Sequence, residues 1–215
     1  MDHFSINNLQ SIKNEEQFKN SNAQIIAVSK TFPREKIEPL ITFGHTHFGE
    51  NKVQEALEKW GELKEKNQNI KLHLIGRLQT NKVKYCLPLF DYIHSLDNYK
   101  LAEKISSEQK KKNFKPKVFI QVNIGEESQK NGIQINLLEQ FINECNNNLD
   151  LDIIGLMCIP PNDNKSNLYF KKMNELNLRY SFKHLSMGMS ADYKEALNFG
   201  ATYIRIGSKI FGSRS

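Results

Sequence analysis

The chain has 215 residues, of which 39% are hydrophobic and 25% are charged. This composition is typical of a folded domain with a substantial core and argues against a disordered chain. No apolar run approaches the roughly 20 residues that a membrane helix needs, and the N-terminal residues lack the apolar stretch of a signal peptide. The formal net charge of +6 leaves nucleic acid, anionic surfaces and phosphorylated ligands as partner classes.

Local patterns remove some of these classes. The basic run 109–117 contains one aromatic residue, Phe114, and lacks the regular interleaving of aromatic and basic residues that a single-strand platform requires, so we interpret it as a solvated helix end leading into a strand and predict no nucleic-acid partner. The three cysteines are scattered and form no C-x-x-C, which favours a reducing cytoplasm without disulfides or a zinc site. His45 and His47 share a face, but no third ligand stands at a recognised spacing, so no metal site is predicted.

Along the chain, short β-branched or apolar runs alternate with longer segments of helical spacing. The runs predict eight strands, at residues 25–30, 46–50, 70–76, 91–96, 117–124, 151–157, 183–188 and 202–207. Residues 51–66, 137–145 and 190–200 have the apolar spacing of amphipathic helices, and Gly200 is placed to end the last of them. This alternation predicts an α/β fold built from parallel βαβ units.

Eight such units predict one closed (β/α)8 TIM barrel over residues 1–215, with a doubly wound open sheet as the alternative. The chain is short for a barrel, which typically has about 250 residues, so the loops are expected to be short. No helix of any length follows the eighth strand. We therefore expect the segment around residues 5–20 to supply the missing outer helix.

Strand parity predicts which side chains face the barrel interior. Arg205 lies on the face opposite Ile204, while His73 and Gln121 lie on the corresponding faces of their own strands. Polar groups therefore gather inside the barrel towards the C-terminal strand ends, where active sites of such barrels lie. Lys30 ends the first strand at this same mouth.

Small residues follow the last two strands, in "SMGMS" (186–190) and "GSKIFG" (207–212). Such loops let backbone N–H groups and serine hydroxyls approach an anion, and barrels often bind phosphate at these two loops. A desolvated lysine has a lowered pKa and can form a Schiff base, which is the chemistry that Lys30 could supply at the mouth. A phosphorylated aldehyde meets both conditions, and pyridoxal 5′-phosphate (PLP) is such a compound, with Arg205 able to reach its pyridine nitrogen.

Seven motifs together carry a family resemblance: "AVSKTFP", "FGENKVQE", "LHLIGRLQTNK", "QVNIGEESQKNG", "GLMCIPP", "LSMGMSADYKEAL" and "RIGSKIFG". From about Ile25 to Arg214 the chain resembles the YggS/PROSC family of pyridoxal phosphate homeostasis proteins. The resemblance implies the barrel of the alanine racemase N-terminal domain, which is the third structural class (fold type III) of PLP proteins.

The resemblance also implies roles for single residues. Lys30 would carry PLP covalently as the internal aldimine, and Arg205 would face the pyridine nitrogen. Members often have histidine where Arg77 stands and threonine where Ser208 stands, and the second change keeps the hydroxyl. The phosphate would be held by Ser186, Met187, Gly188, Ser190, Gly207 and Ser208, and the cofactor would be lined by Asn51, His73 and Met157.

Further charged residues near these motifs have simpler interpretations. Glu50 and Glu55 bracket the start of a predicted helix, where acids commonly favour the helix dipole. Lys82 in "QTNK" is either a second, transient PLP contact or a solvated lysine.

Three functions compete. We interpret the protein as a monomeric PLP carrier without turnover, with PLP-dependent apo-enzymes as transient recipients. A racemase-like enzyme would need a tyrosine opposite the lysine. Alanine racemase takes that tyrosine from a second domain, which we expect to be absent because the chain ends just after strand eight. Tyr203 is expected to pack inside the barrel. The third function is a barrel enzyme unrelated to PLP, with Lys30 as an aldolase-type lysine.

Proton exchange separates these functions. A carrier exchanges the Cα proton of alanine and other amino acids in deuterated buffer no faster than free PLP does, as NMR would measure. Turnover well above free PLP would contradict the carrier interpretation. The aldolase-type enzyme instead predicts no visible chromophore and borohydride trapping of Lys30 only with a sugar substrate.

Overall fold

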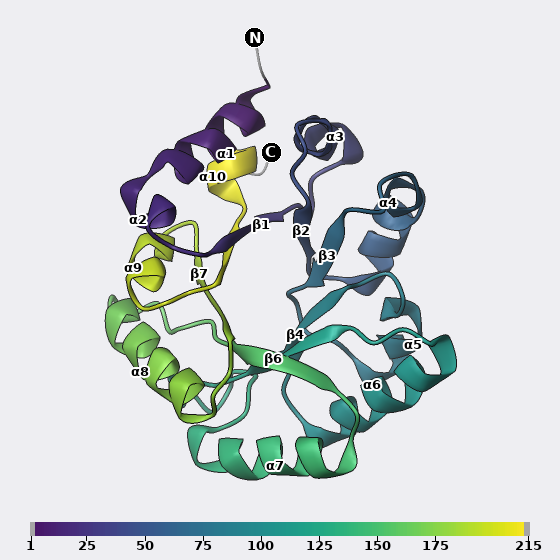
Figure 1. The fold of residues 1–215 in the computed structure, drawn as a ribbon, viewed down its shortest axis with the longest axis vertical. Coiled ribbons are helices and arrows are strands. Elements are labelled where there is room, and N and C mark those ends of the chain that lie inside the picture. The colour runs from purple at the N-terminus through teal and green to yellow at the C-terminus, as the bar shows by residue number, and fades with distance from the viewer. Residues whose placement is uncertain (1–2, 213–215) are drawn as a thin grey trace.

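The computed structural model describes residues 3–212. Eight parallel strands pair in chain order and β8 also pairs with β1, so the sheet closes into a barrel (Figure 1). The predicted fold class is therefore confirmed, and the open-sheet alternative is wrong. The strands are β1 (Gln24–Val28), β2 (His47–Glu50), β3 (Lys71–Leu74), β4 (Tyr92–Leu96), β5 (Lys117–Gln121), β6 (Asp152–Met157), β7 (His184–Met189) and β8 (Tyr203–Ile206).

Helices surround this barrel on the outside (Figure 1). The three predicted helices correspond to α4, α7 and α9, and Gly200, with φ of +81°, follows the end of α9 as expected. Within residues 3–212, none of the helices is both long and apolar enough to span a bilayer. The helices are α1 (Phe4–Asn14), α2 (Glu16–Lys19), α3 (Arg34–Thr42), α4 (Val53–Lys66), α5 (Val83–Cys86), α6 (Tyr99–Lys112), α7 (Leu138–Asn148), α8 (Ser166–Arg179), α9 (Tyr193–Asn198) and α10 (Ser208–Phe211), with the 3-10 turns η1 (Thr80–Lys82) and η2 (Ile135–Leu137).

The N-terminal helix completes the outer ring, as the sequence predicts. Within residues 3–212, the four residues of α10 are the only helix after β8, and α1 lies beside them (Figure 1). Asn8 on α1 donates a hydrogen bond to the carbonyl of Ile210 at 3.1 Å. The hydroxyl of Tyr193 on α9 donates to Glu15, just after α1, at 2.6 Å. Hydrogen bonds therefore connect the N-terminal helical segment to both α9 and α10.

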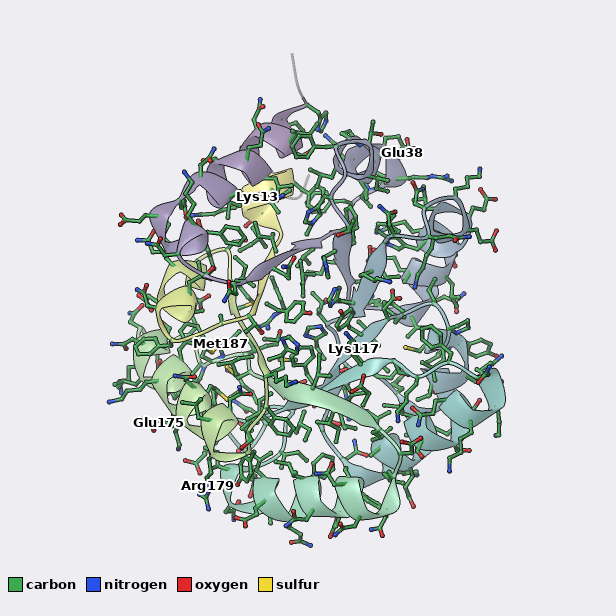
Figure 2. The ribbon with its side chains drawn as sticks, in the orientation of Figure 1. Lys13, Glu38, Lys117, Glu175, Arg179 and Met187 are labelled. Carbon is green, nitrogen blue, oxygen red and sulfur yellow. The ribbon has the colours of Figure 1, made fainter. Side chains whose placement is uncertain are left out.

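Apolar side chains form two cores, because successive residues of a strand point to opposite faces. The outer core lies between strands and helices and includes Phe48 and Trp60. The inner core lies inside the barrel, where side chains fill the enclosed space (Figure 2). Charged side chains such as Glu38 and Arg179 lie on the outer helices, exposed to solvent (Figure 2). The buried residues of the inner core are Ile26, Tyr92, Phe119, Met157 and Tyr203.

Gly155 allows β6 and β7 to approach closely. A Cβ atom at this position would lie 1.8 Å from the carbonyl oxygen of His184 on β7, so backbone would have to move. By contrast, a Cβ atom at Gly61 in α4 would meet nothing within 4 Å. The packing of β6 on β7 therefore requires glycine at position 155, whereas position 61 has room for a side chain.

We predict that Gly155→Ala lowers the free energy of unfolding by about 3 kcal/mol or more, because the new methyl group overpacks backbone against backbone. Gly61→Ala is the matched control and should raise the free energy of unfolding by about 0.5–1 kcal/mol through helix propensity. Urea unfolding of both variants measures this. Equal stability of Gly155→Ala and the unchanged protein would contradict the strand spacing described here.

Candidate functional site at the barrel mouth

A cavity of about 450 Å3 opens at the C-terminal ends of the strands. Its volume lies in the range typical of small-molecule sites, roughly 300–1,000 Å3. The structure brings six predicted site residues together here: Lys30, Asn51, Ser190, Arg205, Gly207 and Ser208. Sequence reasoning placed Gln121 inside the barrel and noted Arg77, but it assigned none of the other lining residues to a site: Val28, Phe32, Ile75, Gly76, Arg77, Gln121, Asn131, Ile159, Met189, Ala191 and Gly212.

A buried carboxylate braces the turn that carries Lys30. Glu50 is fully buried at the end of β2 and accepts hydrogen bonds from the hydroxyl of Ser29 at 2.7 Å and from the indole of Trp60 at 2.9 Å. The ammonium group of Lys59 donates to the same Glu50 oxygen at 3.0 Å and to the Ser29 carbonyl at 2.8 Å. The interpretation of Glu50 as a helix-start acid is therefore wrong, because β2 directs this side chain towards α4.

The other side of the same turn is held by Glu55. Thr31 has φ of +66°, a left-handed conformation that is strained for a β-branched residue. Its backbone N–H donates to Glu55 at 2.6 Å, and Lys59 donates to the same carboxylate at 3.3 Å. Partial burial opposes ionisation of Glu55, but the Thr31 N–H and Lys59 outweigh it and hold the pKa of Glu55 below its usual value. Lys30 therefore stands on a turn that is fixed from both sides.

Arg205 places a cation in the wall of the cavity. It is only 4% exposed, and it donates from Nη1 to the hydroxyl of Ser186 at 2.7 Å and from Nη2 to the carbonyl of Cys158 at 2.8 Å. A guanidinium keeps its charge in proteins and can only donate hydrogen bonds. Burial raises the pKa of the Cys158 thiol to about 12, so this neighbour stays neutral.

The loops after β7 and β8 meet at the cavity. The backbone N–H of Gly207 donates to the hydroxyl of Ser190 at 3.3 Å, which joins the two loops directly. Ser208 is the first residue of α10, is exposed, and lines the same cavity. Two hydroxyls therefore face one space whose walls also carry an amine and a guanidinium.

The other predicted site residues lie elsewhere. His73, Met157 and Ser186 are fully buried in the barrel interior, and Ser186 reaches the cavity only through Arg205. Met187 points into the outer core, because it has the opposite strand parity from Ser186. Gly188 has φ of +89°, and a Cβ atom there would lie 2.6 Å from the Cβ atom of Ala196, so it sets the packing of β7 on α9.

Lys82 lies in a separate hollow of about 360 Å3 beside the mouth cavity. Asn51 and Arg77 line both spaces, so the two adjoin. The structure does not bring Lys82 to the wall of the mouth cavity itself, and Arg77 is the basic residue that the two hollows share.

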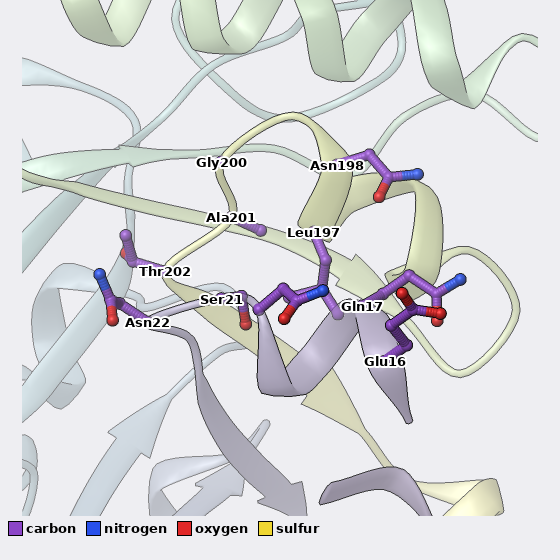
Figure 3. Close-up of a pocket in the computed structure, with 10 residues that line it drawn as sticks. Glu16, Gln17, Ser21, Asn22, Leu197, Asn198, Gly200, Ala201 and Thr202 are labelled. Carbon is purple, nitrogen blue, oxygen red and sulfur yellow. The ribbon is translucent and has the colours of Figure 1, made fainter. Parts of the chain in front are cut away.

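Another hollow, of about 620 Å3, lies at the opposite end of the barrel (Figure 3). Asn22 precedes β1 and Thr202 precedes β8, which places this hollow at the N-terminal strand ends. Glu16 is the one acidic or basic residue among the described residues that line it. Because it offers an anion no cation, we assign the candidate site to the mouth.

The barrel, the lysine after β1 and the small-residue loops after β7 and β8 define a class of protein, the alanine racemase type of barrel. The family model described as "Alanine racemase, N-terminal domain" matches residues 6–215. The alanine racemase of Clostridium difficile has a similar fold, with a TM-score of 0.75 at 19% identity over 98% of this chain and 57% of that one.

Full-length relatives narrow the class. Pyridoxal phosphate homeostasis proteins of Aquifex aeolicus and Haemophilus influenzae are 39% and 38% identical, covering 89% and 94% of this chain and 87% and 89% of theirs. The structure of PipY from Synechococcus elongatus with PLP bound matches with a TM-score of 0.88 at 31% identity over 97% of this chain and 100% of that one. The chain therefore belongs to the pyridoxal phosphate homeostasis protein family, as predicted, and this family has no established catalytic activity.

Lys59 provides a test of the brace beneath Lys30. We predict that Lys59→Met lowers the free energy of unfolding by about 3–5 kcal/mol, because it leaves the Glu50 carboxylate buried without a cation. Within residues 3–212, Oε2 of Glu50 already has no hydrogen-bond partner, which adds to this cost.

Lys104→Met is the matched control, since Lys104 pairs with Glu108 four residues later on α6, whereas Lys59 pairs with Glu55 four residues earlier on α4. Lys104 is 38% exposed against 10% for Lys59, so its loss should cost no more than about 0.5 kcal/mol. Urea unfolding measures both variants, and similar losses would show that the buried network is no more important than a surface pair.

Proposed function

We propose that the protein holds PLP in the mouth cavity, through a covalent bond from Lys30, as a carrier and not as an enzyme. The observation that carries this proposal is that Lys30, Arg205 and the Ser190 and Ser208 hydroxyls line one cavity. PLP has three matching groups: an aldehyde that condenses with an amine and releases water, a ring nitrogen, and a phosphate dianion.

The donor set fits these groups one by one. Lys30 supplies the amine, and Arg205 supplies a permanent donor for the ring nitrogen. We propose that Ser190, Gly207 and Ser208 contact the phosphate, with Gly188 and Met187 shaping the loop that leads to it. Asn51 would line the ring from the cavity wall. Ser186, His73 and Met157 would support it from the barrel interior.

Two features support binding without turnover. When bound, PLP supplies an electron sink, but a guanidinium that can only donate keeps the ring nitrogen unprotonated and weakens this property. Among the described residues that line the cavity, the titratable ones are Lys30, Arg77 and Arg205, and all of these are basic. A racemase-like reaction needs an acid on the face opposite the lysine.

Tyr203 does not take that role. It begins β8 at the N-terminal end, four residues before Gly207, and thus roughly 13 Å from the mouth at about 3.3 Å per residue. Its hydroxyl donates to the hydroxyl of Tyr92 at 3.5 Å, and burial raises its pKa. This position supports a packing role inside the barrel, as the sequence indicates.

The carrier proposal extends to partners. The mouth cavity opens to solvent, and PLP-dependent apo-enzymes that receive the cofactor there are the partners we propose. The barrel as described closes its own sheet and leaves no strand edge open for pairing, which supports a monomer. The scattered cysteines without a C-x-x-C motif support a location in the cytoplasm.

Ser208→Asp tests where the phosphate binds. We predict that PLP affinity falls at least about tenfold, because the new carboxylate stands beside the phosphate and repels it. Fluorescence titration with PLP measures the dissociation constant. Ser107→Asp makes the same charge change at an exposed position of α6 and should leave affinity unchanged. Equal affinities for both variants would locate the phosphate elsewhere.

A further inference from the structure

A line of hydrogen-bonded side chains crosses the barrel interior and ends at Arg205. His47 on β2 contacts His73 on β3, with Nδ1 and Nε2 2.9 Å apart. His73 contacts His94 on β4, with Nδ1 and Nε2 again 2.9 Å apart. Nδ1 of His94 lies 2.9 Å from the hydroxyl of Ser186 on β7, which accepts from Arg205. We call His47, His73, His94 and Ser186 the histidine chain.

The histidine chain is enclosed by aromatic rings. His73, His94 and Ser186 are all 0% exposed. The ring of Tyr92 stacks on His73 with centroids 4.2 Å apart, and the ring of Phe119 stacks on His94 at 4.3 Å. In such surroundings water cannot replace a lost partner of His73, His94 or Ser186, so the polar atoms of these three side chains depend on one another.

Arg205 fixes the direction of these hydrogen bonds. Because the guanidinium can only donate, the Ser186 oxygen must accept from it. The single hydroxyl hydrogen of Ser186 is then directed to Nδ1 of His94. His94 must therefore carry its proton on Nε2, which it donates to His73.

The same reasoning applies next to His73 and then to His47. His73 accepts at Nδ1 and donates from Nε2 to Nδ1 of His47, so each imidazole is the neutral Nε2–H tautomer. Burial holds the pKa of His73 and of His94 well below the usual value, which agrees with neutral rings. If Nδ1 of His94 instead donated to Ser186, the Ser186 oxygen would accept two hydrogen bonds, and its own hydrogen would have no acceptor within the histidine chain.

We propose that His94 and His73 are positioning residues for the cofactor site: they orient the Ser186 hydroxyl so that its oxygen, and not its hydrogen, faces Arg205. The guanidinium is thereby held in the cavity wall. This inference rests on the proposed function only where it assigns Arg205 to the PLP ring.

The tautomers can be measured without PLP. Long-range 1H–15N NMR of the 15N-labelled full chain distinguishes a protonated from an unprotonated ring nitrogen at each histidine. We expect His47, His73 and His94 all to be protonated at Nε2 and unprotonated at Nδ1. A proton on Nδ1 of His94 would overturn the proposal, whatever the protein's affinity for PLP.

Two variants of His94 test the effect on the site. His94→Leu removes the acceptor for the Ser186 hydroxyl, and we expect PLP affinity to fall about tenfold as the bond to Arg205 loses its geometry. His94→Asn can present a carbonyl oxygen close to the position of Nδ1, so its affinity should stay within about threefold of the unchanged protein. The absorbance maximum of bound PLP should shift in His94→Leu and return in His94→Asn.

Phe119→Leu is the control for packing, because it loosens the ring stack on His94 but leaves every hydrogen bond of the chain. Its affinity should also stay within about threefold of the unchanged protein. Equal losses in all three variants, or none in His94→Leu, would overturn the positioning role. If His94→Leu does not fold, the NMR tautomers and His94→Asn decide. Failure of the unchanged protein to bind PLP would instead refute the proposed function and leave the tautomer result standing.

Discussion

A guanidinium buried inside a parallel barrel has to be met by acceptors, and this constraint organises the interior of the protein. Arg205 enters from β8, and its neighbours are the Ser186 hydroxyl within β7 and the Cys158 carbonyl just after β6. Isolated burial of such a charge would cost many kcal/mol. The strands β6, β7 and β8 therefore have to bring these acceptors to this side chain, and their arrangement shapes part of the cavity wall.

The part of the wall that carries Lys30 depends on a second buried charge, the carboxylate of Glu50. Glu50 and Lys59 hold the turn after β1 from below, and Glu55 holds it from the side, so Lys30 projects from a fixed backbone. Lys30 and Arg205 are thus two of the cations in the cavity wall, and each is supported by polar groups that do not line the cavity. A rigid cavity with both groups in place needs little reorganisation to accept a small phosphorylated aldehyde.

Much of this arrangement follows from strand parity and position. The alternation of β-branched runs placed eight strands, and residues at the C-terminal strand ends, such as Lys30 and Ser208, line the mouth as predicted. The histidine chain was not predicted, because the sequence does not give the register that aligns His47, His73 and His94 on adjacent strands, and His94 meets Ser186 only across the closed barrel. Glu50 was misassigned because sequence alone places it beside a helix start, whereas the strand buries it. Asn131 and Ile159 reach the cavity on loops, for which strand parity gives no direction.

Covalent attachment of PLP to Lys30 is the central claim, and borohydride reduction tests it most directly. The purified protein is loaded with PLP, its absorbance spectrum is recorded before and after reduction, and the modified peptide is mapped. The account predicts that the visible band is lost on reduction, with the label on Lys30 in "AVSKTFP" and no label at full occupancy in Lys30→Ala. A label on another lysine, or a visible band that borohydride leaves unchanged, would contradict it.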